Sequence, residues 1–135
     1  MDLISDTTQE YNPKRDFTTL DCWIKARKVK LFFFNEILPK LPPEEKYQLA
    51  SQIKNAIISI TANIAEGYGR YHFKESVQFY RISRGSEYEL KDHLITCYDF
   101  NYIDEETFSR GLGLLEDAKI SINGFINYVK QMMKQ

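Results

Sequence analysis

Apolar residues recur at helical intervals along most of the chain and divide it into four segments. In the segment of about residues 44–67, isoleucines and one leucine are spaced by four, four, three and four residues, which places them on one side of a helix. They are Leu49, Ile53, Ile57, Ile60 and Ile64. Similar spacing continues over about 19–38, 73–100 and 105–133, and strand-like alternation is absent from the sequence. The pattern therefore predicts four α-helices.

Residues that start or end helices separate these segments. We expect the first helix to begin at Thr18 or Thr19, which can cap it, and to stop at Pro39, because proline lacks an amide donor. The remaining boundaries fall at Gly67, Gly69, Asn101 and Asp104. Because the connections are short, each helix is expected to run antiparallel to the next. The sequence thus predicts an all-α, single-domain, up-down-up-down four-helix bundle over 18–135, preceded by a flexible arm over 1–17.

The first predicted helix carries more apolar surface than one bundle requires. One stripe contains Trp23, Ala26, Val29, Phe33 and Ile37, and an adjacent stripe contains Ile24, Leu31, Phe34 and Leu38. The second stripe is a candidate oligomer interface, because large apolar patches on monomers usually mark contacts. Alternatively, the N-terminal arm folds back over it.

A polar stripe accompanies the isoleucines of the second helix and has a counterpart on the third. Its residues are Gln52, Ser59, Asn63 and Glu66, followed by Gly67; the third helix offers Gly85, Ser86 and Glu89. One interpretation is a buried hydrogen-bond network, with Gly85 allowing a close helix approach. The other is a pocket at the end of the bundle, where the glycine turn and Arg70 bind an anion such as phosphate.

Basic residues cluster in the first helix at Lys25, Arg27, Lys28 and Lys30, and Arg70 follows the second. They form either a solvated face or, repeated around an oligomer, a continuous basic surface for the backbone of RNA or DNA. The net charge of −1 and pI near 6.1 exclude a protein whose whole surface binds nucleic acid, so only a local patch could do so.

The sequence offers no recognisable catalytic set. His72 and His93 each lack a second metal ligand at helical spacing, and phosphate-binding glycine loops and nucleophile motifs are absent from the sequence. Cys22 and Cys97 are expected to be buried thiols. We therefore expect that the protein is not an enzyme and that it binds neither a metal nor a cofactor. No apolar run is long enough for a membrane span, and the polar N-terminus favours a cytoplasmic protein.

Several short motifs resemble one known family. Leu20–Ala26 is similar to its apolar-x-x-Trp-x-x-Ala opening and Pro43–Leu49 to its Pro-x-Glu-x-Tyr-x-Leu motif, followed by a Gln-Ile pair at Gln52. Ser59–Gly67 resembles its signature, and Gly85–Leu90 its motif in the third helix. These are the 23S rRNA intervening-sequence proteins, some of which are encoded within insertions in bacterial 23S ribosomal RNA genes.

The resemblance implies a four-helix bundle that assembles as a homopentameric ring with a central channel. Related bundles with a basic exterior bind nucleic acid and a reverse transcriptase, so structured RNA or a nucleoprotein is the partner that the resemblance suggests. It supplies no catalytic residues. The alternative function is a protein-interaction scaffold without nucleic-acid binding.

Overall fold

Four α-helices make up most of the part of the chain that the structure describes. In the computed structural model, which describes residues 16–70 and 72–134, they are α2 (Asp21–Phe32), α3 (Leu49–Tyr68), α4 (Phe73–Asp99) and α5 (Glu105–Met132). No strand occurs within these two ranges. The prediction of an all-α chain with four helices is confirmed, whereas most of the predicted arm, residues 1–15, lies outside the described part.

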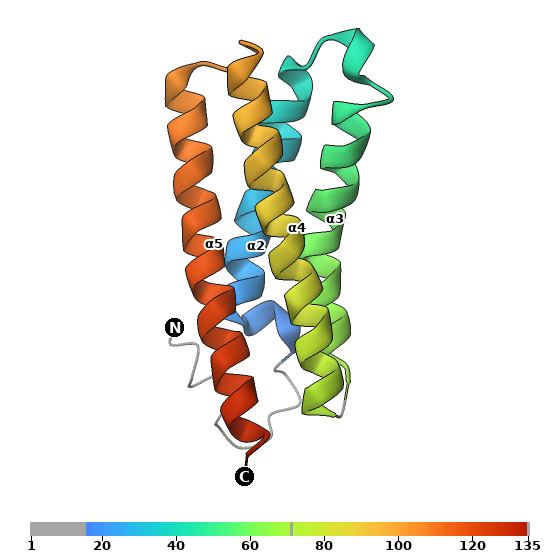
Figure 1. Cartoon of the computed structure of the whole chain (residues 1–135), viewed down its shortest axis with the longest axis vertical. Helices are drawn as coiled ribbons and strands as arrows, with labels where there is room; N and C mark the ends of the chain where they lie inside the picture. The colour runs from blue at the N-terminus through green and yellow to red at the C-terminus, as the bar shows by residue number, and fades with distance from the viewer. Residues whose placement is uncertain (1–15, 71, 135) are drawn as a thin grey trace.

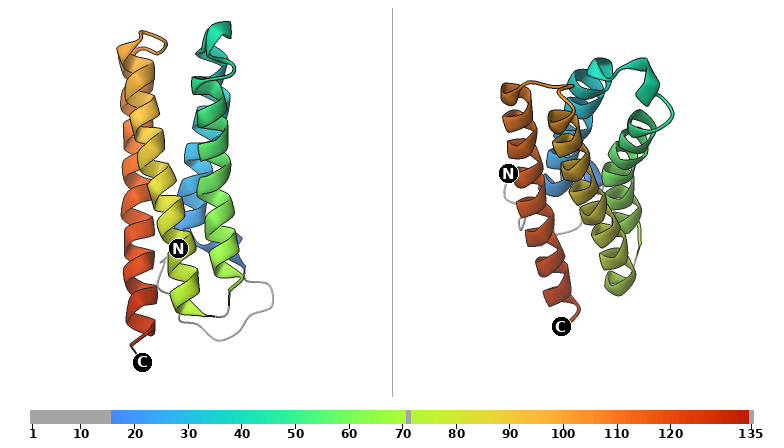
Figure 2. Two further views of the ribbon diagram at one scale, coloured as in Figure 1. Left: turned by 45° about the vertical axis from the view of Figure 1, so that its right-hand side comes forward. Right: turned by 45° about the horizontal axis from the view of Figure 1, so that its top comes forward.

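The four helices lie side by side along the long axis of the molecule (Figure 1). α3 packs against α4 and α4 against α5, while α2 contacts both α3 and α5 and lies behind α4 and α5 in this view (Figures 1 and 2). Each helix therefore has two neighbours and one side that faces the common core.

The first helix begins later than Thr18 or Thr19. The Asp16 carboxylate accepts a hydrogen bond from the Thr18 amide at 2.9 Å, and Phe17–Thr19 form a 3-10 turn, η1. Leu20 then adopts an extended conformation, and α2 starts at Asp21. The expectation that a threonine caps the helix is wrong, because Asp16 caps the preceding turn instead.

The end of the first helix also differs from the prediction. α2 continues into a π-helical turn, η2 (Phe33–Ile37), and then into a 3-10 turn, η3 (Leu38–Lys40). Pro39 lies inside this 3-10 turn, near its start, where its missing amide hydrogen breaks no hydrogen bond. The chain thus stays helical beyond Pro39 instead of stopping there.

The second helix starts five residues later than the predicted residue 44. Pro43–Glu45 form a separate 3-10 turn, η4, and α3 begins at Leu49. Gln48 has φ −121° and ψ −98°, a non-helical conformation that separates the two elements. The acidic pair after the prolines therefore belongs to a turn and not to α3.

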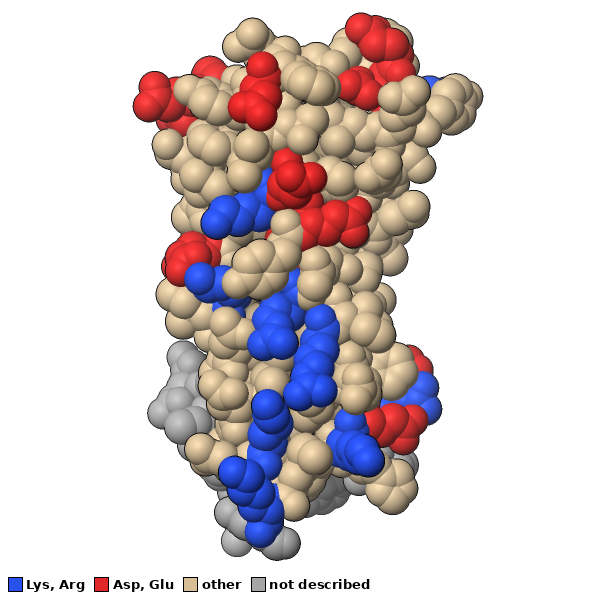
Figure 3. Space-filling view, in the orientation of Figure 1, with Lys and Arg blue, Asp and Glu red and all other residues tan. Residues whose placement is uncertain are grey.

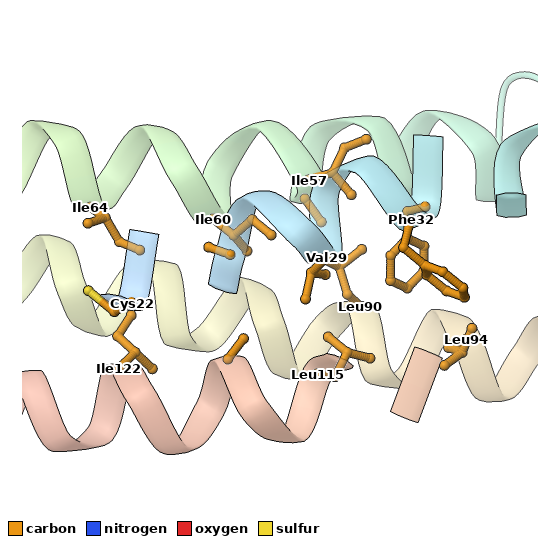
Figure 4. Packing of buried hydrophobic residues seen from close by; sticks show 14 of the residues in the cluster. Cys22, Val29, Phe32, Ile57, Ile60, Ile64, Leu90, Leu94, Leu115 and Ile122 are labelled. Carbon is orange, nitrogen blue, oxygen red and sulfur yellow. The ribbon is translucent and has the colours of Figure 1, made fainter. Parts of the chain in front are cut away.

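The core contains side chains from all four helices (Figure 4). Along it lie, among others, Cys22, Val29, Phe32, Ile57, Ile60, Ile64, Leu90, Leu94, Leu115 and Ile122. Both cysteines are buried and unpaired, as predicted, and burial raises the pKa of the Cys97 thiol to about 11. Within 16–70 and 72–134, no helix combines the length and apolar character needed to cross a membrane.

Candidate functional sites

Part of the predicted polar stripe does meet its counterpart between α3 and α4. The Ser59 and Ser86 hydroxyl oxygens lie 2.8 Å apart, within hydrogen-bonding distance. The Asn63 amide nitrogen donates to both the carbonyl and the hydroxyl oxygen of Ser59, at 2.9 Å each. These three half-buried residues form one network that links the two helices.

The other polar members of the stripe make different contacts. Gln52 is exposed, and Glu89 binds His93, with 2.9 Å between its carboxylate oxygen and the histidine Nε2. Glu66 forms an ion pair with Arg70 at 2.6 Å. The structure therefore brings Ser59, Asn63 and Ser86 together but leaves these side chains outside the network.

The two glycines of the stripe differ sharply in their surroundings. A Cβ atom at Gly67 would lie 2.7 Å from the Tyr80 ring and 3.0 Å from the Ser76 carbonyl oxygen, so α4 passes close to α3 there. A Cβ at Gly85 would meet nothing within 4 Å. The expected close approach at Gly85 is wrong, because this glycine faces outward and is exposed.

Arg70 is already surrounded by acidic partners. Besides Glu66, it binds Glu75 at 3.1 Å, and its guanidinium lies over the Phe79 ring, 4.8 Å from the ring centroid. One cation between two carboxylates leaves a net negative local charge, which opposes the binding of an anion. This geometry disfavours the phosphate site suggested for the end of the bundle.

Two of the four cations on α2 have partners within the protein. The Lys25 ammonium lies 3.9 Å from the Asp21 carboxylate, and the Lys30 ammonium donates to the buried Thr61 hydroxyl at 3.2 Å. Both lysines are only partly exposed. They are therefore less available to an external phosphate than a solvated lysine would be.

The remaining α2 cations, Arg27 and Lys28, are exposed and lie among the second apolar stripe. At about 100° per residue, they share one side of the helix with Ile24, Leu31 and Phe34. Leu31 is 37% exposed and Phe34 58% exposed, whereas Ile24 is half-buried. We call these five residues the α2 outer strip. Candidate phosphate contacts and candidate subunit contacts thus occupy the same surface.

Leu38, the fourth residue of that apolar stripe, is not part of the outer strip. It is the first residue of the turn η3, which follows η2, and it is partly buried and packs against the protein's own core. As a subunit contact, Leu38 is therefore much less available than Phe34.

A larger group of cations lies on the opposite side of the molecule from α2. Figure 3 shows Lys and Arg side chains gathered over the lower half of the face formed by α4 and α5, while acidic residues lie mainly toward the upper end. These helices carry Lys74, Arg81, Arg84, Lys91, Lys119 and Lys130; their other cation, Arg110, instead lies over the Phe32 ring of α2 and pairs with Glu36. The net charge of −1 therefore conceals an uneven distribution of charge.

A pocket of about 310 Å³ opens between α4 and α5. It is lined by Glu87, Tyr88, Lys91, Leu112, Gly113, Leu115, Glu116 and Lys119. Glu87 is only 3% exposed, and neither of its carboxyl oxygens has a hydrogen-bond partner among the described residues. Burial raises its pKa to about 8 despite the opposing charge of Arg84. A buried polar group without a partner is uncommon and costly.

Sequence reasoning missed Glu87, although its position carried a signal. It lies four residues after Ser83 and three before Leu90, in register with the buried face of α4. A glutamate at a core-facing position of a helical stripe is rarely fully buried without a partner.

Within 16–70 and 72–134, no three His, Cys, Asp or Glu side chains are grouped as metal ligands would be.

Comparison with family models shows what the sequence is similar to. A family model described as 23S rRNA-intervening sequence protein matches residues 18–124. No curated protein matches the sequence. The matched range includes α2, α3, α4 and most of α5.

Proposed function

This chain belongs to the 23S rRNA-intervening sequence protein family, and from this premise we propose that it is a non-catalytic, homo-oligomeric four-helix bundle that associates with RNA. The proposed oligomer is a pentamer, as the sequence resemblance implies. The proposal includes a cytoplasmic location, which agrees with the two buried, unpaired thiols. It includes neither a cofactor nor a catalytic residue.

The proposed subunit is an antiparallel up-down-up-down bundle. Two contacts between α2 with its continuation and α5 support this direction: Asp21 accepts a hydrogen bond from Ser121, and Glu36 pairs with Arg110 at 2.6 Å. Moving forward along the first segment therefore means moving backward along α5.

The observation that carries the proposed self-association is the α2 outer strip. Phe34 and Leu31 are large apolar side chains on one exposed side of a helix whose opposite side is fully buried in the core. Covering this strip with a neighbouring subunit would remove apolar surface from water. The mass of the particle in solution tests this.

Light scattering during size exclusion should give a multiple of the 15.9 kDa chain mass, and five times that mass for the pentamer. Leu31→Lys with Phe34→Lys should dissociate the particle, because two buried charges would oppose each contact. Ile58→Lys is the control, at an isoleucine of α3 that is 62% exposed. A wild-type monomer at micromolar concentration would refute the oligomer.

RNA association is proposed for the cationic face of α4 and α5, and not for the α2 outer strip. A subunit contact on the strip would cover Arg27 and Lys28, whereas the face in Figure 3 would stay open. Lysine and arginine that neutralise phosphates release counterions, so binding should weaken steeply as salt rises. The competing function, a protein-interaction scaffold, predicts no RNA binding.

The RNA proposal is tested by titrating fluorescent structured RNA at several salt concentrations. We expect the wild type to bind with a negative slope of log affinity against log salt, and Arg81→Ala with Lys130→Ala to reduce that slope. Lys46→Ala, on the turn before α3, is the matched control. Absence of binding at about 50 mM salt, or binding that ignores salt, would instead favour the scaffold.

A further inference from the structure

The pocket between α4 and α5 contains a carboxyl group that the fold itself leaves without a partner. Glu87 is only 3% exposed, and neither of its carboxyl oxygens has a hydrogen-bond partner among the described residues. It nevertheless lines a cavity of about 310 Å³, a volume within the range of small-molecule pockets. Both oxygens are covered by other atoms in this conformation, so a ligand in the cavity would supply the missing hydrogen bonds once the side chain turned toward it.

The other lining residues restrict the chemistry of that ligand. Leu112 and Leu115 offer apolar walls, and Tyr88, which is 52% exposed, offers an aromatic ring. A Cβ at Gly113 would meet nothing within 4 Å, so a flat group has room beside it. Such a lining suits an aromatic ring with polar edges better than it suits a bare ion.

Two lysines complete the site. Lys91 of α4 and Lys119 of α5 both line the pocket. Lys119 pairs with Glu116 at 2.9 Å, whereas Lys91 is exposed. The ammonium group of Lys91 therefore suits an anionic group attached to the ring, whereas that of Lys119 is already paired.

We propose that this pocket binds one nucleotide, with its nucleobase hydrogen-bonded to Glu87 and its phosphate held by Lys91. The nucleotide is either free or an unpaired residue of RNA, and in the second case the inference rests on the proposed RNA association. A nucleobase accounts for the apolar walls, the aromatic side chain and the unpaired carboxyl together. An isolated phosphate would account only for the lysines.

The protonation of Glu87 fits this ligand. Its pKa of about 8 means that the carboxyl is largely protonated at pH 7 and offers one O–H donor and one carbonyl acceptor. The Watson–Crick edge of adenine presents one N–H donor beside one ring-nitrogen acceptor, which matches that pair. The charged or titratable groups around Glu87 are Cys22 of α2, Arg84, Tyr88 and Lys91 of α4, and Glu116 and Lys119 of α5.

The direct test is calorimetric titration of the full chain with adenosine 5′-monophosphate, with ribose 5-phosphate as the control ligand. We expect a dissociation constant below about 1 mM for the nucleotide and at least about tenfold weaker binding of the sugar phosphate. Binding should weaken as pH rises through 8, because an ionised Glu87 loses its donor. Equal binding of both ligands, or none of the nucleotide, overturns the proposal.

Variants separate the role of Glu87 from its effect on folding. Glu87→Gln keeps one donor and one acceptor, so it should bind the nucleotide but lose the pH dependence. Glu87→Met should weaken binding at least about tenfold. Asp92→Asn, at an exposed carboxylate of α4 outside the pocket lining, should change neither property. If Glu87→Met binds as the wild type does, the inference is wrong.

A second route closes the pocket without altering the carboxyl. Gly113→Leu places a side chain in open space, so it should keep the melting temperature while abolishing nucleotide binding. Lys91→Ala should weaken the binding of the nucleotide but not that of the uncharged nucleoside. Lys54→Ala, on α3, is the control for this variant. A Gly113→Leu protein that stays folded and still binds the nucleotide normally refutes this location.

RNA probes identify the source of the nucleotide. An RNA oligonucleotide with one unpaired adenine is compared with the same oligonucleotide carrying an abasic site. If the first binds more tightly, and Glu87→Met removes this difference, the nucleotide comes from RNA. If free nucleotide binds and no RNA does, the pocket stands but the proposed RNA association fails. If duplex RNA binds with salt dependence and free nucleotide does not, the function stands and the pocket inference fails.

Discussion

The Ser83 hydroxyl of α4 donates a 2.6 Å hydrogen bond to the Ile60 carbonyl oxygen of α3, and both residues are fully buried. The acceptor also belongs to the backbone of a regular helix, so the bond fixes the position of one helix against the other. A serine whose polar group is satisfied across the interface can therefore occupy a core position that would otherwise require an apolar residue.

Ser83→Ala should lower the free energy of unfolding by about 1 kcal/mol, the usual net worth of one buried hydrogen bond. Urea denaturation followed by circular dichroism measures the difference. Ser109→Ala, at an exposed position of α5, should change it by less than about 0.5 kcal/mol. Equal effects at the two positions would mean that the bond between the helices adds no stability.

Gly111 and Gly113 lie two residues apart on α5 but should respond oppositely to alanine. A Cβ at Gly111 would lie 2.6 Å from a Leu94 methyl and 2.8 Å from the Phe32 ring, so Gly111→Ala should lower the unfolding free energy by about 1–3 kcal/mol. Gly113→Ala should raise it by up to about 1 kcal/mol, because alanine favours the helix and the space is empty. Thermal and urea melts of both variants test the contrast, and a stabilising Gly111→Ala contradicts the packing.

The Asn63 amide should contribute to stability through Ser59. Asn63→Ala removes two 2.9 Å hydrogen bonds from a half-buried site, and we expect a loss of about 1 kcal/mol. A double-mutant cycle with Ser59→Ala should give a coupling energy of about 0.5 kcal/mol or more, because the two side chains are in contact. Additive effects would show that the network does not act as a unit.

Glu87 should make stability depend on pH. Its folded pKa of about 8 lies above its ordinary value of 4.5, so the folded state binds more protons between these values and stability falls as pH rises through that window. The loss is at most about 1.4 kcal/mol per pH unit and should level off above pH 8.

Glu87→Gln removes this proton uptake, so the difference between the variant and the wild type isolates the contribution of Glu87. The free energy of unfolding of the variant, relative to that of the wild type, should rise by about a few kcal/mol from pH 4.5 to pH 8. Urea melts at half-unit pH steps measure the difference. A difference that stays constant across the window would show that Glu87 ionises in the folded protein as it does in water.

The sequence predicted the helices best where long apolar stripes end at a capping residue. Asp104 illustrates this: its carboxylate accepts from the Thr107 amide at 2.8 Å, and α5 begins at the next residue. Spacing also placed Ser59 and Ser86 on two polar stripes that could form a network, and the structure brings these two side chains together. Both signals are local, because they depend only on the period of the helix and on the chemistry of one residue.

Signals that depend on the tertiary structure were harder to read. Gly85 looked like a close-contact glycine but faces outward, because a glycine does not show on which side its neighbours lie. The burial of Glu87 depends on α5 as well as on α4, and no local pattern reports the depth of the groove between them. The apolar spacing of the first helix likewise gave no sign of the π-helical turn η2.

That turn has a consequence for how the chain tolerates changes in length. A π-helical turn holds one residue more than an α-helical turn in the same rotation. Deleting Asn35 from η2 (Phe33–Ile37) would therefore convert it to an ordinary turn while the side chains of Phe33 and Ile37 still faced the core. Elsewhere in a packed helix, the same deletion would rotate every following residue by about 100°. At this site the deletion of one codon would leave the bundle intact.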